Sequence, residues 1–342
     1  MKKLILLFLP LLWAGVLLAQ GPVEVKDISG SGQNKLKKSP KRVYIAQFRV
    51  NYQLLYSQVE KDQGGRTLGG GYRGSVEAGL SMAVQGIETT DLMEITDKLY
   101  NDYVSSFKSA GYEIVTIDEA SKAKSFEGWE RKMGGTLNEA QYQGYITAIP
   151  TGFEYFVKKT KEGGREKTGF IDNSLKISGD LNVTVIKVNL VVPFVEDAES
   201  GASKALGKAA GGVAKIVLRP YLRIEKDPVA TAGTFSTDAA QTKTTYSFKE
   251  SAGSMGATYL HLKSDIAIPG IFEDKKYKAV ETASQDLWGT QVGALTIFNV
   301  SDNYLKKTQP LPVDAQKYKE AVGQAAWGYL KATLDKYFSH VK

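Results

Sequence analysis

The chain of 342 residues contains no cysteine. It therefore forms no disulfide, holds no metal through thiolates and has no cysteine nucleophile. It also lacks the cysteine that a bacterial lipoprotein carries at its mature N-terminus. A hydrophobic core must stabilise the fold, and the length is sufficient for one large domain or two smaller ones.

Histidine is almost as scarce, because only His261 and His340 occur. His261 lies between two leucines in a strand-like pattern, which favours a structural role, and His340 stands close to the C-terminus. The sequence has no His-Glu-x-x-His spacing, no Gly-x-Ser-x-Gly nucleophile turn and no calcium loop. It therefore predicts no catalytic residue, no metal and no cofactor, and leaves open an enzyme whose two carboxylates converge only in space.

Apolar stretches that approach the length of a membrane-spanning helix are absent except near the N-terminus. Two lysines precede a charge-free stretch from Leu4 to Leu18, and small residues follow at Ala19 and Gly21. This stretch is shorter than the roughly 20 residues that a membrane-spanning helix needs. A basic start, a short apolar core and small residues at its end are typical of a secretory signal peptide. Residues 1–21 therefore predict export to the periplasm or the periplasmic face of the outer membrane, with the extracellular space as the alternative.

An excess of one charge sign is also slight, since 44 Lys and Arg face 37 Asp and Glu. The resulting formal charge of +7 is too mild to indicate a nucleic-acid partner. One concentration of cations stands out in a strand pattern, Val213–Glu225. On one face of that strand the alternation places Lys215, Arg219, Tyr221 and Arg223. We take this face as the candidate interaction surface, for an acidic partner or for contact with lipid headgroups.

The remaining patterns divide the chain into a leader and a folded region. Residues 22–42 are rich in Gly, Ser and Lys without an apolar period, which predicts a flexible basic leader. Residues 43–342 are predicted to form a single globular domain or two intimately packed halves. These halves would be a hairpin–helix–strand half, 43–172, and a β-rich half with a C-terminal helix, 173–342.

Period-two and helical patterns alternate, which predicts an α+β (mixed α/β) fold. We expect a twisted, mostly antiparallel sheet packed by two main helices, 91–110 and 315–339, with a β-rich second half. Thr90 or Asp91 is expected to cap the first helix, and Asp314 the second. The stretch Gly64–Gly74 lacks the Gly-Lys-Ser/Thr ending of a phosphate loop, so it is predicted to be the tip of a hairpin.

Several shorter segments carry local predictions. In the strand Val43–Val50 we place Tyr44, Ala46, Phe48 and Val50 on one face. A further strand is expected at Tyr112–Ile117, a helix at Ala120–Met133 and a short strand at Phe153–Val157. The run Leu181–Glu196 changes parity near Ile186, which indicates a β-bulge or a strand covered on both faces.

Leu181–Glu196 and Val213–Glu225, joined by a Gly- and Ala-rich segment, predict a long hairpin. In one interpretation both strands complete the sheet. In the other they insert into a membrane as part of a closed ring of subunits, because a lone hairpin leaves backbone groups unpaired in lipid. The interrupted alternation of Leu181–Glu196 favours the first interpretation.

The order of these segments resembles the layout of the curli secretion channel family and related exported periplasmic proteins. The resemblance covers roughly residues 43–120 and 175–340. It implies a periplasmic domain of sheet and helices and, for the channel members, an oligomer that inserts β-hairpins into the outer membrane. The chain departs from the channels, which are lipoproteins, in having no cysteine. No specific motif is shared, so no functional residue is carried over.

These absences, together with the abundance of Tyr (18) and Gly (34) in strands that we expect at sheet edges, predict the function. We expect a non-catalytic exported cell-envelope protein that binds an envelope or outer-membrane protein. One alternative is a subunit of an oligomeric outer-membrane secretion channel, which would make the chain a homo-oligomer. The other is a carboxylate-based hydrolase that acts on envelope polymers.

Overall fold

The structure is a computed structural model. It describes residues 22–28, 30–62, 76–167, 172–199, 214–228, 240–250, 255–281, 288–292, 295–300 and 308–342. The predicted signal peptide and the stretch Gly64–Gly74 lie outside these residues, as does the segment that joins the two strands of the predicted 181–225 hairpin.

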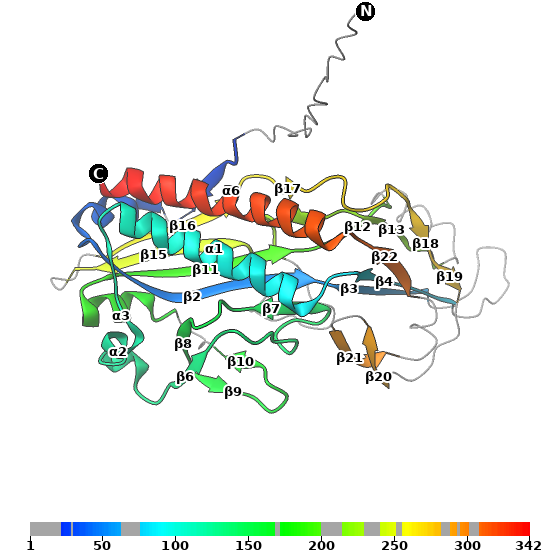
Figure 1. The fold of residues 1–342 in the computed structure, drawn as a ribbon, viewed down its shortest axis with the longest axis horizontal. Helices are drawn as coiled ribbons and strands as arrows, with labels where there is room; N and C mark the ends of the chain where they lie inside the picture. Colours follow the sequence, from blue (N-terminus) through cyan, green and yellow to red (C-terminus); the bar gives the residue numbers. More distant parts are fainter. Residues whose placement is uncertain are drawn as a thin grey trace, which may run out of the picture.

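A seven-stranded sheet runs along the long axis of the molecule (Figure 1). Its strands follow the spatial order β1 (Val25–Asp27), β16 (Met255–Leu262), β15 (Lys243–Lys249), β11 (Thr184–Val192), β2 (Arg42–Gln53) and β5 (Glu113–Ile114), with β7 (Tyr145–Ala148) also paired to β2. β2 pairs in parallel with β11 and β5, and the other pairs are antiparallel. The predicted mixed fold with a mostly antiparallel sheet is confirmed.

Two long helices, α1 (Thr89–Ser109) and α6 (Ala315–Val341), lie side by side over one face of this sheet (Figure 1). Both predicted helices are therefore confirmed. The N-cap of α1 is Glu88, so neither predicted cap, Thr90 or Asp91, is correct; Asp91 lies within the first turn, where its Oδ2 accepts a hydrogen bond from the Glu88 backbone N–H at 2.9 Å. Asp314 caps α6 as predicted, accepting from the Lys317 backbone N–H at 2.8 Å. These caps supply partners for backbone groups that the first turn leaves unpaired.

Tyrosine side chains fill much of the interface between the helices and the sheet. The Tyr103 and Tyr246 hydroxyls are 2.8 Å apart, and the Tyr329 hydroxyl donates to the Leu260 carbonyl at 3.0 Å. Burial raises the pKa of all three phenols, which therefore remain neutral. The expectation that tyrosine belongs to edge-like strands is wrong for these residues, because each phenol buries its ring in the core and keeps a hydrogen bond for its hydroxyl.

A β-bulge lies where β2 pairs with β11. Ile186 pairs with Ile45 and Lys187 pairs with Gln47, so Ala46 is an extra residue in β2. The predicted bulge near Ile186 is confirmed, but the inserted residue belongs to the neighbouring strand.

The extra residue reverses which face of β2 each side chain occupies. Ile45 and Phe48 both join the core beneath the helices, whereas Tyr44 packs with Phe126 in a second cluster on the opposite face. The predicted shared face of Tyr44 and Phe48 is therefore wrong, because an inserted residue shifts a two-residue period by one. Apolar clusters cover β11 on both sides, as the parity change also indicated.

The segment predicted to be a flexible leader is ordered where it is described. Residues 25–27 form β1 at the edge of the main sheet, and Gly30–Lys38 form a 3-10 helix, η1. The Leu36 side chain is completely buried, and Lys263 Nζ lies 2.7 Å from Glu24 Oε2. The prediction is wrong because a few widely spaced anchors, rather than a periodic apolar face, attach this segment.

Short elements cover the other face of the sheet. They are α2 (Ile117–Ala120), the 3-10 helix η2 (Lys124–Phe126), β6 (Glu130–Met133), β8 (Glu154–Val157), β9 (Lys159–Thr160), β10 (Glu166–Lys167) and α3 (Ser174–Leu181). The helix predicted at Ala120–Met133 is wrong, since only its first residue belongs to α2 and its last four form β6. The strand predicted at Tyr112–Ile117 shortens to β5, while the strand at Phe153–Val157 is confirmed by β8.

Smaller sheets complete the molecule. Their strands are β3 (Leu55–Asp62), β4 (Val76–Gln85), β12 (Val195–Asp197), β13 (Val217–Pro220), β14 (Arg223–Ile224), β17 (Ile266–Ala267), β18 (Tyr277–Lys278), β19 (Val280–Glu281), β20 (Trp288–Val292), β21 (Leu295–Val300) and β22 (Gln309–Pro312). Of these, β3, β4, β12, β13, β18, β19 and β22 extend the molecule beyond the helices, whereas β17 lies alongside α6 (Figure 1). The hairpin with a glycine-rich tip was predicted to join Val43–Val50 and Val76–Val84. The second of these strands is β4, but its antiparallel partner is β3, whereas Val43–Val50 belongs to β2 of the main sheet.

The predicted 181–225 hairpin differs in detail from the structure. Its first strand divides into the central strand β11 and the short β12, and Leu181 belongs to α3 instead. Its second strand is broken into β13 and β14. Val195 pairs with Pro220 in an antiparallel register. Backbone hydrogen bonds continue this contact beyond the two short strands, because the Arg223 and Glu225 N–H groups donate to the Pro193 and Val191 carbonyls at 3.2 and 3.1 Å.

Candidate functional site

The predicted interaction face does not form on a single strand. β13 ends at Pro220, which has no backbone N–H to continue a ladder, and Arg223 begins a separate strand. The Lys215 ammonium lies 3.5 Å from Glu199 Oε1, and Arg219 Nε donates to Glu196 Oε1 at 2.9 Å. Carboxylates of the same chain therefore offset both cations, which lowers their attraction for an acidic partner.

Arg223 lies at the centre of a separate, largely buried cluster. Its guanidinium lies 2.6 Å from Glu225 Oε2 and 3.6 Å from Asp265 Oδ2, and it covers the Tyr221 ring at 5.1 Å. Burial raises the pKa of Glu225, although Arg223 opposes this effect. Asp265 lines a pocket of about 440 Å³, but Glu225 is not among its lining residues. The cluster therefore fixes β14 in place and does not present two carboxylates to a common cavity.

Both histidines lie near β1, and the charge of Asp27 acts on each imidazole. His261 is buried, with Nδ1 3.2 Å from Gln241 Nε2, and burial lowers its pKa. His340 Nε2 lies 3.5 Å from Asp27 Oδ2 and so connects the end of α6 to β1. In the part of the chain that the structure describes, no group of three or more His, Asp or Glu could hold a metal ion. Nor does any helix there have the length and apolar character to span a membrane.

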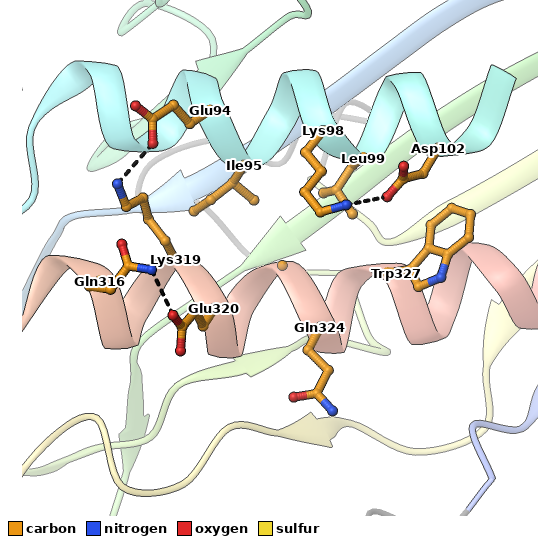
Figure 2. Close-up of a pocket in the computed structure, with 11 residues that line it drawn as sticks. Glu94, Ile95, Lys98, Leu99, Asp102, Gln316, Lys319, Glu320, Gln324 and Trp327 are labelled. Atoms are coloured by element: carbon orange, nitrogen blue, oxygen red, sulfur yellow. Dashed lines mark hydrogen bonds and ion pairs between the residues drawn. The ribbon is translucent and has the colours of Figure 1, made fainter. Parts of the chain in front are cut away.

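A groove between α1 and α6 is the candidate functional site (Figure 2). Its volume is about 420 Å³. We call it the α1–α6 groove, and it is lined by Glu94, Ile95, Lys98, Leu99, Asp102, Gln316, Lys319, Glu320, Gly323, Gln324 and Trp327. Ile95 and Leu99 are buried and form the floor, whereas Trp327 is half-buried and stands at one end. The groove therefore offers an apolar surface with an aromatic wall.

The sequence of α6 explains why the two helices leave a groove here. Lys319, Gly323 and Trp327 are four residues apart and so lie along one side of α6. Glycine interrupts this row where a side chain would otherwise stand. A Cβ built on Gly323 would meet no atom within 4 Å, so a larger residue would fit without a clash. Closer to the C-termini of both helices, Phe107 and Phe338 pack with their ring centres 5.5 Å apart.

Charged side chains surround this apolar floor and hold one another in place (Figure 2). Lys319 Nζ lies 2.8 Å from Glu94 Oε2 and 3.0 Å from Asp91 Oδ1, and Lys98 Nζ lies 2.7 Å from Asp102 Oδ2. Hydrogen bonds to the two carboxylates raise the pKa of Lys319. Both lysines on the rim are thus already neutralised within the chain.

Glu320 differs from the other carboxylates of the rim. Its Oε1 accepts a hydrogen bond from Gln316 Nε2 at 2.6 Å, and no cation of the described residues forms an ion pair with it. With Glu94 and Asp102, it makes three carboxylates against two lysines on the groove lining. The rim is acidic, although the whole chain carries a formal charge of +7.

The groove was not predicted from the sequence. The helical pattern identified the face of α6 that packs on the sheet, and the groove lies beside that face. One signal was present in the sequence, namely Gly323 in the middle of the predicted helix. A glycine there costs about 1 kcal/mol relative to alanine, so it indicates a packing or functional role.

Comparisons with known proteins add no relative. No family model, no curated protein and no solved structure matches the chain. The resemblance to the curli secretion channel family therefore stays a prediction, and function has to be argued from the chemistry of the groove.

Proposed function

We propose that the chain is a non-catalytic, exported cell-envelope protein that acts by binding another protein, in the periplasm or at the outer membrane. The α1–α6 groove is the binding site. Export is supported by the lysines and the apolar core within residues 1–21. Binding is supported by the groove, which combines an apolar floor, an exposed rim of charges and a tryptophan.

The observation that carries this proposal is the gap that Gly323 leaves in the row of α6 side chains, beside Trp327 and above Ile95 and Leu99. We call this gap the pit. Residues that dominate the energy of protein interfaces are enriched in tryptophan and cluster in pockets surrounded by polar groups. The rim is accessible, since 65% of the Glu94 side chain and 75% of the Lys98 side chain are exposed. An apolar group that entered the groove would be shielded from water by Ile95, Leu99 and Trp327.

We favour binding over the two alternatives for specific reasons. The acid with a raised pKa, Glu225, is held by Arg223 and does not line the 440 Å³ pocket, so it is not placed to act there as the general acid of a hydrolase. The first strand of the hairpin that a channel would insert contains β11, which is enclosed by β2 and β15. This arrangement favours a globular domain.

Site-specific photo-crosslinking in cells tests the proposal. A photoreactive residue at Gln324, which lines the groove, should capture a discrete envelope protein. The same residue at Lys331, which is exposed on α6 outside the groove, is the matched control and should not capture that protein. Capture from neither position, or a chain that remains in the cytoplasm with residues 1–21 attached, would contradict the proposal.

A further inference from the structure

We infer that the partner presents a basic amphipathic helix, and that one bulky apolar side chain of this helix seats over Gly323 between Leu99 and Trp327. The inference rests on the proposed function and adds to it the class of partner and the position of the contact. Three features carry it: the pit at Gly323, the straight course of the groove and the acidic rim.

The pit indicates that a single large apolar side chain is received. Packing within the chain does not require glycine at position 323, because an added Cβ would meet nothing within 4 Å. Helix stability does not require it either, since alanine favours a helix more than glycine does. What glycine provides is an opening above the buried Ile95 and Leu99 side chains, which an incoming side chain can cover.

The groove follows two parallel helices, which indicates that the occupant is itself a helix. Glu94 lies against Lys319 at one end of the contact, and Phe107 lies against Phe338 further along, so both helices run in the same direction. The lining on α6 extends from Gln316 to Trp327, which corresponds to roughly 17 Å of helix. Amphipathic helices bind grooves of this kind with apolar anchors at intervals of three and four residues.

The charge of the rim indicates that the helix is basic. Glu320 has no cationic partner among the described residues, and the side chain of Glu94, on the other helix, is largely exposed. A lysine or arginine placed one helical turn from the apolar anchor would reach this side of the rim. An acidic helix would instead approach three carboxylates that only two lysines neutralise.

The test uses the chain from residue 22 to 342 and a defined probe. The probe is a helical peptide of about 15 residues, built from Ala and Gln, with Leu at its centre and Lys four positions to either side. Calorimetry should detect binding of this peptide. Replacing the central Leu by Ala should weaken binding ~10-fold or more, because the buried apolar anchor is lost.

Two variants locate the contact. Gly323→Leu fills the pit and should abolish binding, while the thermal midpoint of the chain stays equal or rises. Glu320→Lys should lower the affinity for the Lys peptide by roughly 5-fold and raise the affinity for a peptide that carries Glu at the same positions. Asp335→Lys, on α6 outside the groove, is the matched control and should change neither affinity.

The outcomes separate this inference from the proposed function. The inference is wrong if no peptide binds, if Gly323→Leu leaves the affinity unchanged, or if the Glu peptide binds the unmodified chain as tightly as the Lys peptide. It is also wrong if the unmodified chain self-associates in sedimentation, or binds phosphatidylglycerol vesicles, and Gly323→Leu abolishes that association or that binding. In each of these cases, crosslinking of an envelope protein from Gln324 would leave the proposed function standing.

Discussion

Replacing Gly323 by alanine should stabilise the protein although it changes the candidate site. Glycine in a helix interior costs about 0.5–1 kcal/mol relative to alanine, mainly because the unfolded chain loses more freedom on folding. No atom lies within 4 Å of the added Cβ, so no steric cost offsets this gain. For a chain of this size, the thermal midpoint should rise by roughly 1 °C. Differential scanning calorimetry of residues 22–342 would measure the shift.

A second glycine in the same helix supplies the control. A Cβ on Gly328 would lie 3.3 Å from Val23 Cγ2, so Gly328→Ala gains the same propensity but compresses a contact with the N-terminal segment. Its midpoint should rise less, or fall. A lower midpoint for Gly323→Ala, or a larger rise for Gly328→Ala, would refute our description of the pit. If the groove binds its partner as we propose, Gly323→Ala should also weaken binding, so that stability and function change in opposite directions.

Three further predictions concern the rest of the fold. Leu36→Ala should lower the free energy of unfolding by about 2 kcal/mol or more in urea titrations, because the Leu36 side chain is completely buried. An unchanged midpoint would mean that residues 22–42 are a flexible leader, as the sequence predicted. Arg49→Met should cost roughly 3 kcal/mol, because Arg49 Nη2 lies 2.7 Å from the buried Glu166 carboxylate, and adding Glu166→Gln should recover part of the loss. Burial would raise the pKa of Asp172, but the Lys187 ammonium holds it at about 2, below its ordinary 3.8. The stability from this pair should therefore be present above pH 3.8 and be lost as the pH falls towards 2, by about 1 kcal/mol after allowance for the 45% exposure of the side chain. Asp172→Asn should flatten that part of the acid titration, and an unchanged titration would contradict the assignment.

The strongest local patterns were sufficient to predict the main elements. In α1 the buried residues recur every three or four positions: Leu92, Ile95, Leu99, Tyr103 and Phe107. An apolar face of this kind is stable only when it is buried, here against the sheet. A helix was wrongly predicted at Ala120–Met133 because this segment has no comparable apolar face. Its conformation instead depends on distant partners, such as the pairing of β6 with β8.

Position in the fold decided what the side chains do. Tyrosine was abundant enough in the sequence to suggest exposed edges, yet Tyr103 and Tyr246 meet in the core although they are 143 residues apart in the chain. The cations Lys215 and Arg219 were noticed because they alternate along the chain, and only the fold showed the carboxylates beside them. Alternation reports which face a residue occupies, but not which charge lies across from it.

The sequence by itself determined the class of the protein: a signal-like N-terminus, no thiol chemistry, and a sheet covered by two amphipathic helices. These features depend on composition and on periods of two and 3.6 residues, which local geometry imposes. Only the tertiary structure decided where a binding site could form. The pit at Gly323 exists because α1 and α6, more than 200 residues apart in the chain, run in parallel with a glycine opposite Ile95 and Leu99. No local pattern records such a juxtaposition, because it depends on how distant segments pack.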